Sequence, residues 1–333
     1  MNTNNNDMLL SVKDLVVEYT SEKDIVQAVN GVSFDLRRGG TIGLVGETGA
    51  GKTSIAKAIC RILPVPPSRI KGGEIFFEGK DVLKLPEDEM RTLRGAKIAM
   101  IFQDPMTALN PIMRVGNQIA ESIQNNTHCS KKEAEEKAKE MLEMVGIPAS
   151  RYREYPHQFS GGMKQRVVIA IALACNPDLL IADEPTTALD VTIQAQVLEL
   201  IKNLQKEKNT AMIMITHDFG IVAEVCDMVA VVYAGQIVEY GNKQQLFKDA
   251  RHPYTMGMFD AIPKIEEDAD KLTPIAGAPT DPTNLPKGCY FGPRCPYATD
   301  ECRTRAIPMK TLQDGHQFRC LYEDVRKTKS EKI

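Results

Sequence analysis

Gly46-Glu47-Thr48-Gly49-Ala50-Gly51-Lys52-Thr53 is the stretch of this sequence that decides the fold. It fits the pattern G-x-x-x-x-G-K-[ST], which is typical of a loop that binds phosphate groups. An apolar run over residues 41–45 predicts a buried strand before the loop, and residues 54–60, which hold neither Gly nor Pro, predict a helix after it. The alternative, an accidental glycine-rich turn, is disfavoured because the eight-residue pattern is specific and its flanks agree with it. The sequence therefore predicts strand, phosphate loop and helix.

The residue types in this loop indicate what it binds. Glycines let the backbone wrap closely around phosphates, so that successive N–H groups and the start of the helix point at the negative charge. The Lys52 ammonium is expected to reach the β- and γ-phosphates of ATP, and the Thr53 hydroxyl to ligate Mg²⁺. ATP and Mg²⁺ are therefore the first predicted cofactors.

Composition limits the other possibilities. The chain has 333 residues, with 41 basic and 44 acidic side chains and a net charge of −3. This balance gives no support to a dedicated nucleic-acid binder, in which a basic stripe is expected. The first ten residues hold no charged segment followed by a long apolar run, and no stretch reaches about eighteen apolar residues. We therefore expect a cytosolic protein without a transmembrane segment of its own, which associates with a membrane only through a partner.

Strand and helix patterns surround the loop. Residues 9–18 and 31–36 alternate apolar and polar side chains and predict an antiparallel sheet, whereas residues 112–148 have a helical pattern. Tyr19 closes the first of these strands. It is either a half-buried strand end or an aromatic platform for the adenine ring, because stacking on a base contributes about 1–3 kcal/mol.

Polar residues follow the predicted buried strands. The strand over 97–102 ends at Gln103, which is well placed to reach Mg²⁺ or the attacking water, since ligands bind at the carboxyl ends of strands in α/β folds. The apolar strand over 179–182 ends at Asp183 and Glu184. We expect Asp183 to hold Mg²⁺ through water and Glu184 to polarise the water that attacks the γ-phosphate. Two solvated loop carboxylates are the alternative, which the phosphate loop disfavours.

Three further positions complete the pattern. A strand predicted over 212–216 ends at His217, which could contact the γ-phosphate or orient Glu184, although an isolated histidine is more often structural. Asp190 begins a turn into a predicted helix. Ser160-Gly161-Gly162 precedes another helix and is either an ordinary N-cap or a second anion-binding terminus.

Taken together, these residues resemble the nucleotide-binding subunit of an ABC transporter. The resemblance covers about residues 8–250 and implies a P-loop α/β core with an antiparallel β subdomain and an α-helical subdomain over about 105–175. It implies catalytic roles for Glu184, His217 and Gln103, and Mg²⁺ contacts from Thr53, Gln103 and Asp183. The signature residues Ser160, Gly161 and Gly162 are implied to contact the ATP of a partner, and Asp190 to form the D-loop. The implied contacts with the chain's own ATP are Tyr19, Gly46, Glu47, Thr48, Gly49, Ala50, Gly51, Lys52, Thr53 and Ser54.

In that family two nucleotide-binding domains close head to tail, so each ATP lies between the Walker A loop of one and the signature helix of the other. The resemblance thus implies a second ATPase subunit, either a related chain or another copy, and two transmembrane permease subunits. The signature has Phe159 and Met163 where Leu and Gln are commoner. Ser160 and both glycines are intact, so we expect catalytic competence.

A narrower resemblance concerns two further stretches. Residues 102–111, FQDPMTALNP, are similar to the Q-loop region of the dipeptide and oligopeptide importer branch, and the chain from Arg251 onward looks like the C-terminal extension of that branch. This extension, 251–333, holds nine of the 19 prolines, so it is predicted to be rich in loops.

Four cysteines gather in the extension: Cys289, Cys295, Cys302 and Cys320. In a reducing cytosol such a group is more typical of a metal centre than of disulfides. No pair has the C-x2–4-C spacing that is usual for structural zinc, and four spread thiolates suit an iron–sulfur cluster better. Zinc and free or oxidised thiols stay open as alternatives. The resemblance itself implies a [4Fe–4S] cluster.

The sequence therefore predicts the ATPase subunit of a peptide importer that acts through separate permease subunits and, indirectly, an extracytoplasmic peptide-binding protein. Nickel, glutathione and oligosaccharides are the alternative cargoes. A soluble ABC protein of DNA repair or translation is disfavoured, because the chain has no second ATPase domain, long coiled coil or basic extension. An iron–sulfur sensor with a regulatory nucleotide site is disfavoured by the intact Asp183, Glu184 and His217.

Overall fold

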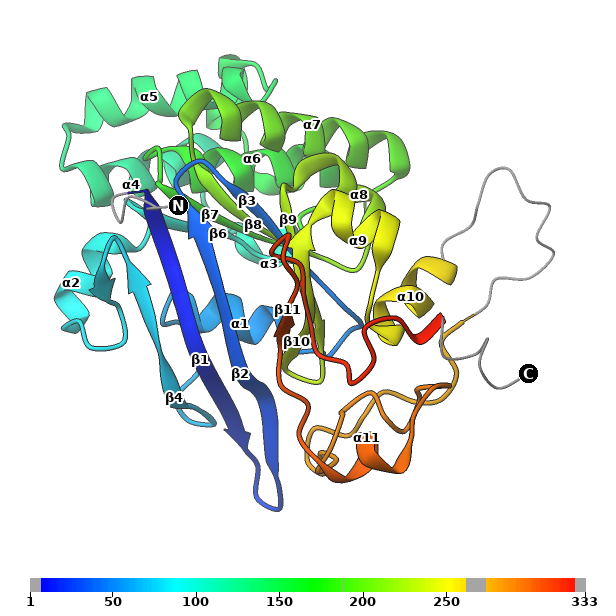
Figure 1. Cartoon of the computed structure of the whole chain (residues 1–333). Helices are drawn as coiled ribbons and strands as arrows, with labels where there is room; N and C mark the ends of the chain where they lie inside the picture. The colour runs from blue at the N-terminus through cyan, green and yellow to red at the C-terminus, as the bar shows by residue number, and fades with distance from the viewer. Residues whose placement is uncertain (1–6, 188, 262–273, 327–333) are drawn as a thin grey trace.

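The computed structural model describes residues 7–187, 189–261 and 274–326. Within these ranges the strands form two sheets (Figure 1). The smaller sheet is antiparallel, with the strand order β2-β1-β4-β5. Its strands are β1 (Met8–Thr20), β2 (Ile25–Arg37), β4 (Ser68–Phe77) and β5 (Lys80–Asp81). The predicted antiparallel sheet is confirmed, and its first two strands are longer than the sequence pattern indicated.

The larger sheet has the order β11-β12-β10-β9-β3-β8-β7-β6. The five strands from β9 to β6 run parallel, and the other three are antiparallel. Their bounds are β3 (Thr41–Val45), β6 (Ile98–Ile101), β7 (Leu179–Asp183), β8 (Ala211–Thr216), β9 (Met228–Tyr233), β10 (Gln236–Asn242), β11 (Lys310–Thr311) and β12 (Gln317–Phe318). A parallel sheet is covered on both faces, which explains the almost continuous apolar runs of β3, β7 and β8.

The two faces of the larger sheet belong to two different cores. Ile42 and Leu44 of β3 pack with the smaller sheet and with helix α1 (Lys52–Ile59), whereas Val45 packs with the helices on the opposite face. The same alternation places Ile213 of β8 in the first core and Met214 in the second. The large sheet is therefore the middle layer of the molecule.

Most of the remaining helices pack in the second core, on the side of the large sheet away from β1 and β2, whereas α2 contributes Met90 to the first core. Figure 1 shows α5, α6 and α7 grouped together there, and α1 lying between the two sheets. The bounds are α2 (Glu87–Leu93), α3 (Pro105–Ala108), α4 (Val115–Thr127), α5 (Lys131–Met144), α6 (Gly161–Leu173), α7 (Val191–Lys208) and α8 (Phe219–Val225), with 3-10 turns at Ala149–Arg153 and Pro156–Gln158.

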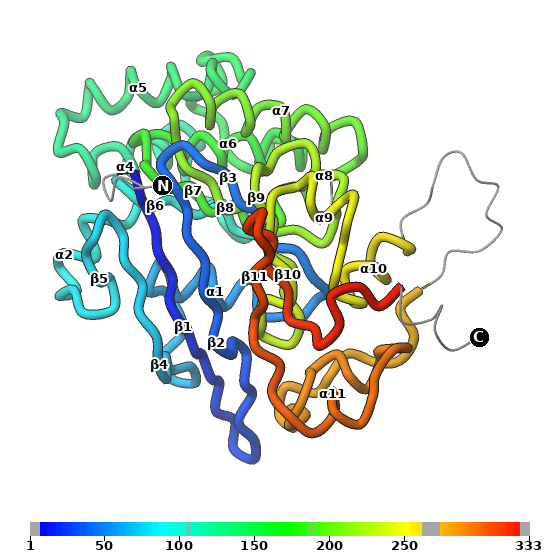
Figure 2. Tube along the Cα trace, in the orientation of Figure 1, coloured from blue at the N-terminus to red at the C-terminus, as the bar shows by residue number. Residues whose placement is uncertain are grey.

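The C-terminal segment, from α9 to residue 326, packs directly on this core. Figure 2 shows the stretch around β11 lying beside β10, with which β12 pairs. Its helices are α9 (Lys243–Asp249), α10 (Pro253–Asp260) and α11 (Asp300–Thr304). Glu239 of β10 is fully buried and accepts hydrogen bonds from His316 Nε2 at 2.8 Å and from the Arg251 N–H at 2.7 Å. Between residues 274 and 326 most of the chain is loop, as predicted; residues 262–273 and 327–333 of the predicted extension lie outside the described ranges.

Residues 61–95 contain β4, which is ten residues long, then β5 and α2. The stretch that follows them differs from the sequence-based expectation. The helical pattern over 112–148 is interrupted, because His128 adopts a left-handed φ of +53° and Ser130 starts α5 in a capping box with Glu133. None of the helices in the described ranges combines the length and apolar character needed to cross a bilayer.

Candidate active site

The carboxyl ends of four parallel strands bring the predicted site residues to one edge of the large sheet. β3 runs into the phosphate loop, β7 ends at Asp183, β8 is followed by His217, and β6 is followed by Gln103 after one residue. Hydrogen bonds join residues from different strand ends, such as Thr53 to Asp183 and Gln103 to Glu184. The edge therefore has the arrangement that α/β folds use to bind ligands.

The phosphate loop requires glycine at two positions. A Cβ at Gly46 would lie 2.1 Å from the carbonyl oxygen of Val232, and one at Gly51 would lie 2.2 Å from that of Ala28. Gly51 also has a φ of +101°, which L side chains rarely adopt. The loop is thus pressed against neighbouring backbone, which fixes its path into α1.

Lys52 lies inside the curve of the loop. Its ammonium donates to the carbonyl oxygens of Gly46 at 2.6 Å and Glu47 at 2.9 Å, and the residue is 5% exposed. Burial lowers the pKa of Lys52, and the nearby carboxylates of Glu184 and Asp183 partly oppose that change. A cation that lies beside the backbone N–H groups of such a loop is suited to bind phosphate.

Thr53 and Asp183 connect the loop to the end of β7. The Thr53 hydroxyl donates to Asp183 Oδ1 at 3.2 Å, and Asp183 is buried. Burial raises the pKa of Asp183, and the adjacent Glu184 carboxylate raises it further. A hydroxyl and a carboxylate side by side are oxygen ligands of the kind Mg²⁺ prefers, so these residues fit the predicted magnesium site.

Glu184 is the centre of a second group of hydrogen bonds. Its carboxylate accepts from Gln103 Nε2 at 2.9 Å and from the Thr187 hydroxyl at 3.0 Å, and its Oε1 lies 3.2 Å from His217 Nδ1. Burial raises the pKa of Glu184, but the hydrogen bonds from His217 and Thr187 outweigh it and hold the pKa below its usual value. The carboxylate is therefore ionised at neutral pH and able to accept a proton.

The backbone at Glu184 supports this placement. Its φ is +46°, which is uncommon for a residue with a side chain and costs of the order of 1–3 kcal/mol. Such strain persists only where the surroundings enforce it, and it is concentrated at functional sites. Gln103 contacts Glu184 through its amide nitrogen, a donor, so the predicted contact of Gln103 with Mg²⁺ stays a prediction.

Tyr19 lies beside the first turn of α1. Its hydroxyl is 3.1 Å from the Ser54 hydroxyl, although the two residues are 35 positions apart. The sequence placed both residues among the ATP contacts, and the structure brings them together. Whether the ring stacks on adenine stays a prediction.

The signature residues lie away from these hydrogen bonds, on the surface of the chain. The Ser160 hydroxyl accepts from the Met163 N–H at 3.3 Å and so caps α6, while Ser160 and Gly161 are exposed. A Cβ on Gly162 would come within 2.5 Å of the Ile193 side chain, so this glycine also allows α6 to approach α7. Asp190 caps α7 by accepting from the Ile193 N–H at 3.0 Å. The surface position suits contact with a second chain.

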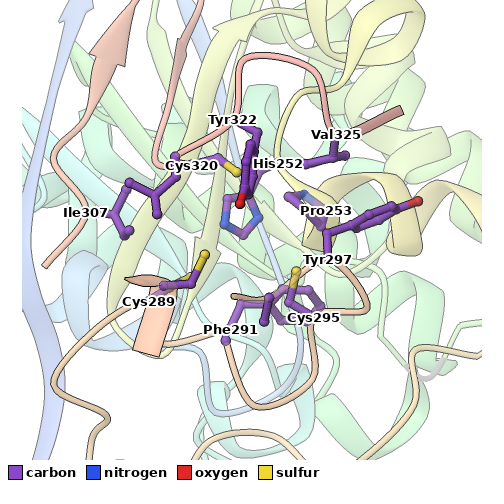
Figure 3. Close-up of a pocket in the computed structure, with 14 residues that line it drawn as sticks. His252, Pro253, Cys289, Phe291, Cys295, Tyr297, Ile307, Cys320, Tyr322 and Val325 are labelled. Atoms are coloured by element: carbon purple, nitrogen blue, oxygen red, sulfur yellow. The ribbon is translucent and has the colours of Figure 1, made fainter. Parts of the chain in front are cut away.

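The four C-terminal cysteines line one small cavity, together with apolar and aromatic side chains and His252. Figure 3 shows the thiols of Cys289, Cys295 and Cys320 directed into this common space. Burial raises the pKa of Cys295 to about 12 and that of Cys320 to about 11. Over the described part of the chain, no set of three or more His, Cys, Asp or Glu side chains is arranged to hold a metal ion. The geometry as it stands gives the predicted metal centre no support beyond the shared cavity.

Sequence patterns missed three residues that contact the site. Thr187 bonds to Glu184 and lies in the turn after β7, where its nearness to Glu184 in sequence could have drawn attention to it. Arg294 and Tyr254 both contact Glu47 of the phosphate loop. Nothing local in the sequence marks these two, because they lie more than 200 residues after the loop.

Comparison with known proteins agrees with the geometry of the site. Residues 29–187 match the family described as ABC transporter, and residues 238–302 match the family described as oligopeptide/dipeptide transporter, C-terminal region. The chain is 53% identical over 311 residues to the oligopeptide transport ATP-binding protein OppD of Bacillus subtilis, with 92% of this chain and 87% of that protein covered. The chain belongs to the family of oligopeptide and dipeptide transport ATP-binding proteins.

Other members of this family are similar over nearly the whole chain. The dipeptide transport ATP-binding protein DppD of Bacillus subtilis is 49% identical, covering 96% of each chain, and OppD of Escherichia coli is 49% identical, covering 94% of this chain and 93% of that one. As a member of the family, the chain is an ABC ATPase that couples ATP hydrolysis to transport.

Solved structures confirm the ABC ATPase fold. The dimeric, post-hydrolysis structure of the ATP-binding cassette MJ0796 with ADP and Pi has a TM-score of 0.64 and 25% identity, covering 70% of this chain and 98% of that one. The cbiO1 protein of Clostridium perfringens has a TM-score of 0.62 and 28% identity, covering 73% and 92%.

Proposed function

We propose that this chain is the ATPase subunit of an importer for oligopeptides or dipeptides. The observation that carries the proposal is the match of residues 238–302 to the C-terminal region of peptide transporters, together with relatives at 47–53% identity whose names specify oligopeptide or dipeptide transport. The proposed organisation is an ABC nucleotide-binding domain at 8–250, with a helical subdomain at about 105–175, and an extension at 251–333.

The site residues have the following proposed roles. Lys52 binds the β- and γ-phosphates, and Thr53 and Asp183 hold Mg²⁺. Water attacks the γ-phosphorus as the bond to the β–γ bridging oxygen breaks, and Glu184 takes the proton from that water. Gln103 and His217, which both contact Glu184 in this structure, orient the carboxylate and the water.

We place the partner subunits at two exposed surfaces. Ser160-Gly161 faces outward and would contact the ATP held by a second ABC ATPase subunit, which is either a related chain or another copy. Phe102 and Ile112 are exposed large apolar side chains on either side of α3, and Ile112 is 86% exposed. Exposed apolar side chains close to Gln103 in the sequence are suited to dock a permease and to transmit the motion of the ATP site. The chain would thus act at the cytoplasmic face of the membrane, with two permease subunits and, indirectly, a peptide-binding protein.

Loss of this chain should abolish uptake of peptides and leave other substrates unaffected. The measurement is accumulation of labelled di-, tri- and pentapeptides, with nickel, glutathione and an oligosaccharide as alternatives, in cells that lack this chain. A plasmid copy of the chain should restore peptide uptake alone. Restored uptake of nickel, glutathione or oligosaccharide without peptide would assign a different cargo to the same ATPase.

We further propose that the four cysteines bind a [4Fe–4S] cluster, with zinc as the alternative. Their side chains fit as a donor set, since iron–sulfur clusters are held by four thiolates and these four line one cavity. The cavity is about 20 Å³, little more than the room for one water, so the thiols must move apart to admit a cluster. A bound cluster would supply cross-links that order a segment with little core of its own.

Iron and sulfide should copurify with the anaerobically purified protein and depend on Cys295. We expect about four irons and four sulfides per chain, with a broad absorbance band near 400 nm, and their loss in Cys295→Ser. Cys129→Ser, which changes a cysteine outside the cavity, should retain the cluster. Stoichiometric zinc without sulfide would select the alternative, and absence of both metals would refute the proposed centre.

A further inference from the structure

Glu47, the second residue of the phosphate loop, is held by an arginine from the C-terminal segment. Arg294 Nη1 donates to Glu47 Oε2 at 2.7 Å, and Arg294 Nη2 donates to Glu47 Oε1 at 3.1 Å. The two residues are 247 positions apart, and the Arg294 side chain is only 4% exposed. Bidentate pairs of this kind fix orientation as well as charge, and they are stronger than neutral hydrogen bonds.

The backbone of Glu47 is held from the same segment. Its N–H donates to the hydroxyl of Tyr254, at the start of α10, over 2.9 Å, and Tyr254 is fully buried. The side chain and the backbone of one loop residue are therefore both fixed by residues outside the ATP-binding core. Contacts from two independent positions limit rotation of this part of the loop.

Arg294 is itself held in place. Its Nε donates to the Ala276 carbonyl at 3.1 Å, and its Nη1 lies 3.4 Å from the Tyr233 hydroxyl. The rings of Tyr233, Tyr254 and Phe291 pack together, with centroids 4.6–5.4 Å apart. A guanidinium with this many fixed partners cannot swing away from Glu47 without breaking several contacts.

Arg294 and Tyr254 together form a clamp on Glu47, and this clamp acts on the atoms that hold Lys52. The Glu47 carbonyl oxygen is one of the two that accept a hydrogen bond from the Lys52 ammonium. A shift of the Glu47 peptide therefore moves both the loop N–H groups and the position of the ammonium. Loss of the clamp would leave the residues of the loop intact but their arrangement less preorganised for phosphate.

We propose that Arg294 is a positioning residue for ATP binding, which acts through Glu47 and with Tyr254 holds the phosphate loop in its binding geometry. This inference rests on the proposed assignment of residues 46–53 as the ATP site. It gives the C-terminal segment a role in nucleotide affinity that is separate from any role of the cysteine cavity. Because Arg294 does not touch the reacting atoms, its loss should change the affinity for ATP more than the rate of the chemical step.

The test is a comparison of ATP affinity and turnover in the purified full-length chain. We expect Arg294→Ala to raise the Kd for a fluorescent ATP analogue, and the KM for ATP, about tenfold or more, with kcat reduced less than threefold. Arg294→Lys should recover part of the affinity, and Tyr254→Phe, which removes only the hydroxyl, should weaken binding by a smaller factor. The matched control is Arg305→Ala, which removes an exposed ion pair with Glu301 in the same segment and should match the wild type.

A double-mutant cycle tests whether Arg294 affects ATP affinity through Glu47 or only by attaching the C-terminal segment to the ATP-binding core. If Arg294 acts through Glu47, then Glu47→Ala combined with Arg294→Ala should weaken ATP binding no more than the worse single variant. Unchanged Kd and KM in Arg294→Ala, with only a lower thermal unfolding midpoint, would overturn the proposal. If Arg294→Ala does not fold, then wild-type affinity in both Arg294→Lys and Tyr254→Phe overturns it. Failure of the wild type and of Arg305→Ala to bind ATP would refute the ATP site itself.

Discussion

Replacing Glu184 by Gln is expected to lower the ATP turnover number by about 10²–10⁴-fold while leaving ATP binding close to that of the wild type, because a positioned general base contributes a factor of this size. Glutamine keeps the shape of the side chain and can still accept hydrogen bonds from Thr187 and Gln103, but it cannot take up the proton of the attacking water. The measurement is steady-state phosphate release, with the Kd for ATP determined on the same preparation.

The matched control is Glu199→Gln, an exposed glutamate on α7 outside the site. It should hydrolyse ATP at the wild-type rate. Normal turnover in Glu184→Gln would remove Glu184 from its proposed role and direct attention to His217 as the group that orients the water.

Replacing Lys52 by Ala should weaken ATP binding about 10- to 150-fold, the equivalent of the 1.5–3 kcal/mol that a hydrogen bond to a charged group contributes. In this structure the ammonium is buried and bonded to two loop carbonyls, and we expect bound phosphates to become its partners. Alanine leaves a cavity at the centre of the loop and no positive charge. Equilibrium binding of ATP in the presence of Mg²⁺ measures the effect.

Lys57→Ala, five residues further along the chain, is the control for loss of a lysine in or near α1. It should bind ATP with the wild-type affinity. Equal weakening in both variants would indicate a general electrostatic effect, and wild-type affinity in Lys52→Ala would contradict the assignment of the phosphate loop.

The core of the site could be predicted from the sequence because its signals are local. The phosphate loop is one continuous stretch between a strand and a helix. Asp183 ends an apolar strand, and Glu184 and His217 each follow one directly. Parallel strands bring their carboxyl ends to one edge, so strands recognised separately predict a common site. The bonds of Thr53 to Asp183 and of Glu184 to His217 are the contacts this logic anticipates.

Contacts made by the C-terminal segment could not be predicted in this way. Arg294 reaches Glu47 across 247 positions, and the bond depends on the path of the chain over Tyr233 and Phe291. No periodicity or motif encodes such a path. The break between α4 and α5 was missed for a different reason, since the left-handed His128 interrupts a pattern whose apolar spacing continues on both sides.

The cysteines lie between these two cases. Their concentration in the extension predicted a common site, and the structure places all four around one cavity. Spacing along the chain cannot fix the distances between thiols, because these depend on how the loops pack. Iron, sulfide and zinc analysis of the purified protein decides whether a metal centre forms there.

Simultaneous measurement of ATP hydrolysis and peptide import tests the central claim most directly. The transporter, purified through a tag on this chain with its partner subunits and peptide-binding protein, would be placed in vesicles that enclose ATP and Mg²⁺, and both rates would be recorded for the wild type and Glu184→Gln. We predict that peptide accumulates only with hydrolysis and that the variant reduces both rates together. Peptide accumulation at the wild-type rate in the Glu184→Gln vesicles, with hydrolysis abolished, would contradict the account.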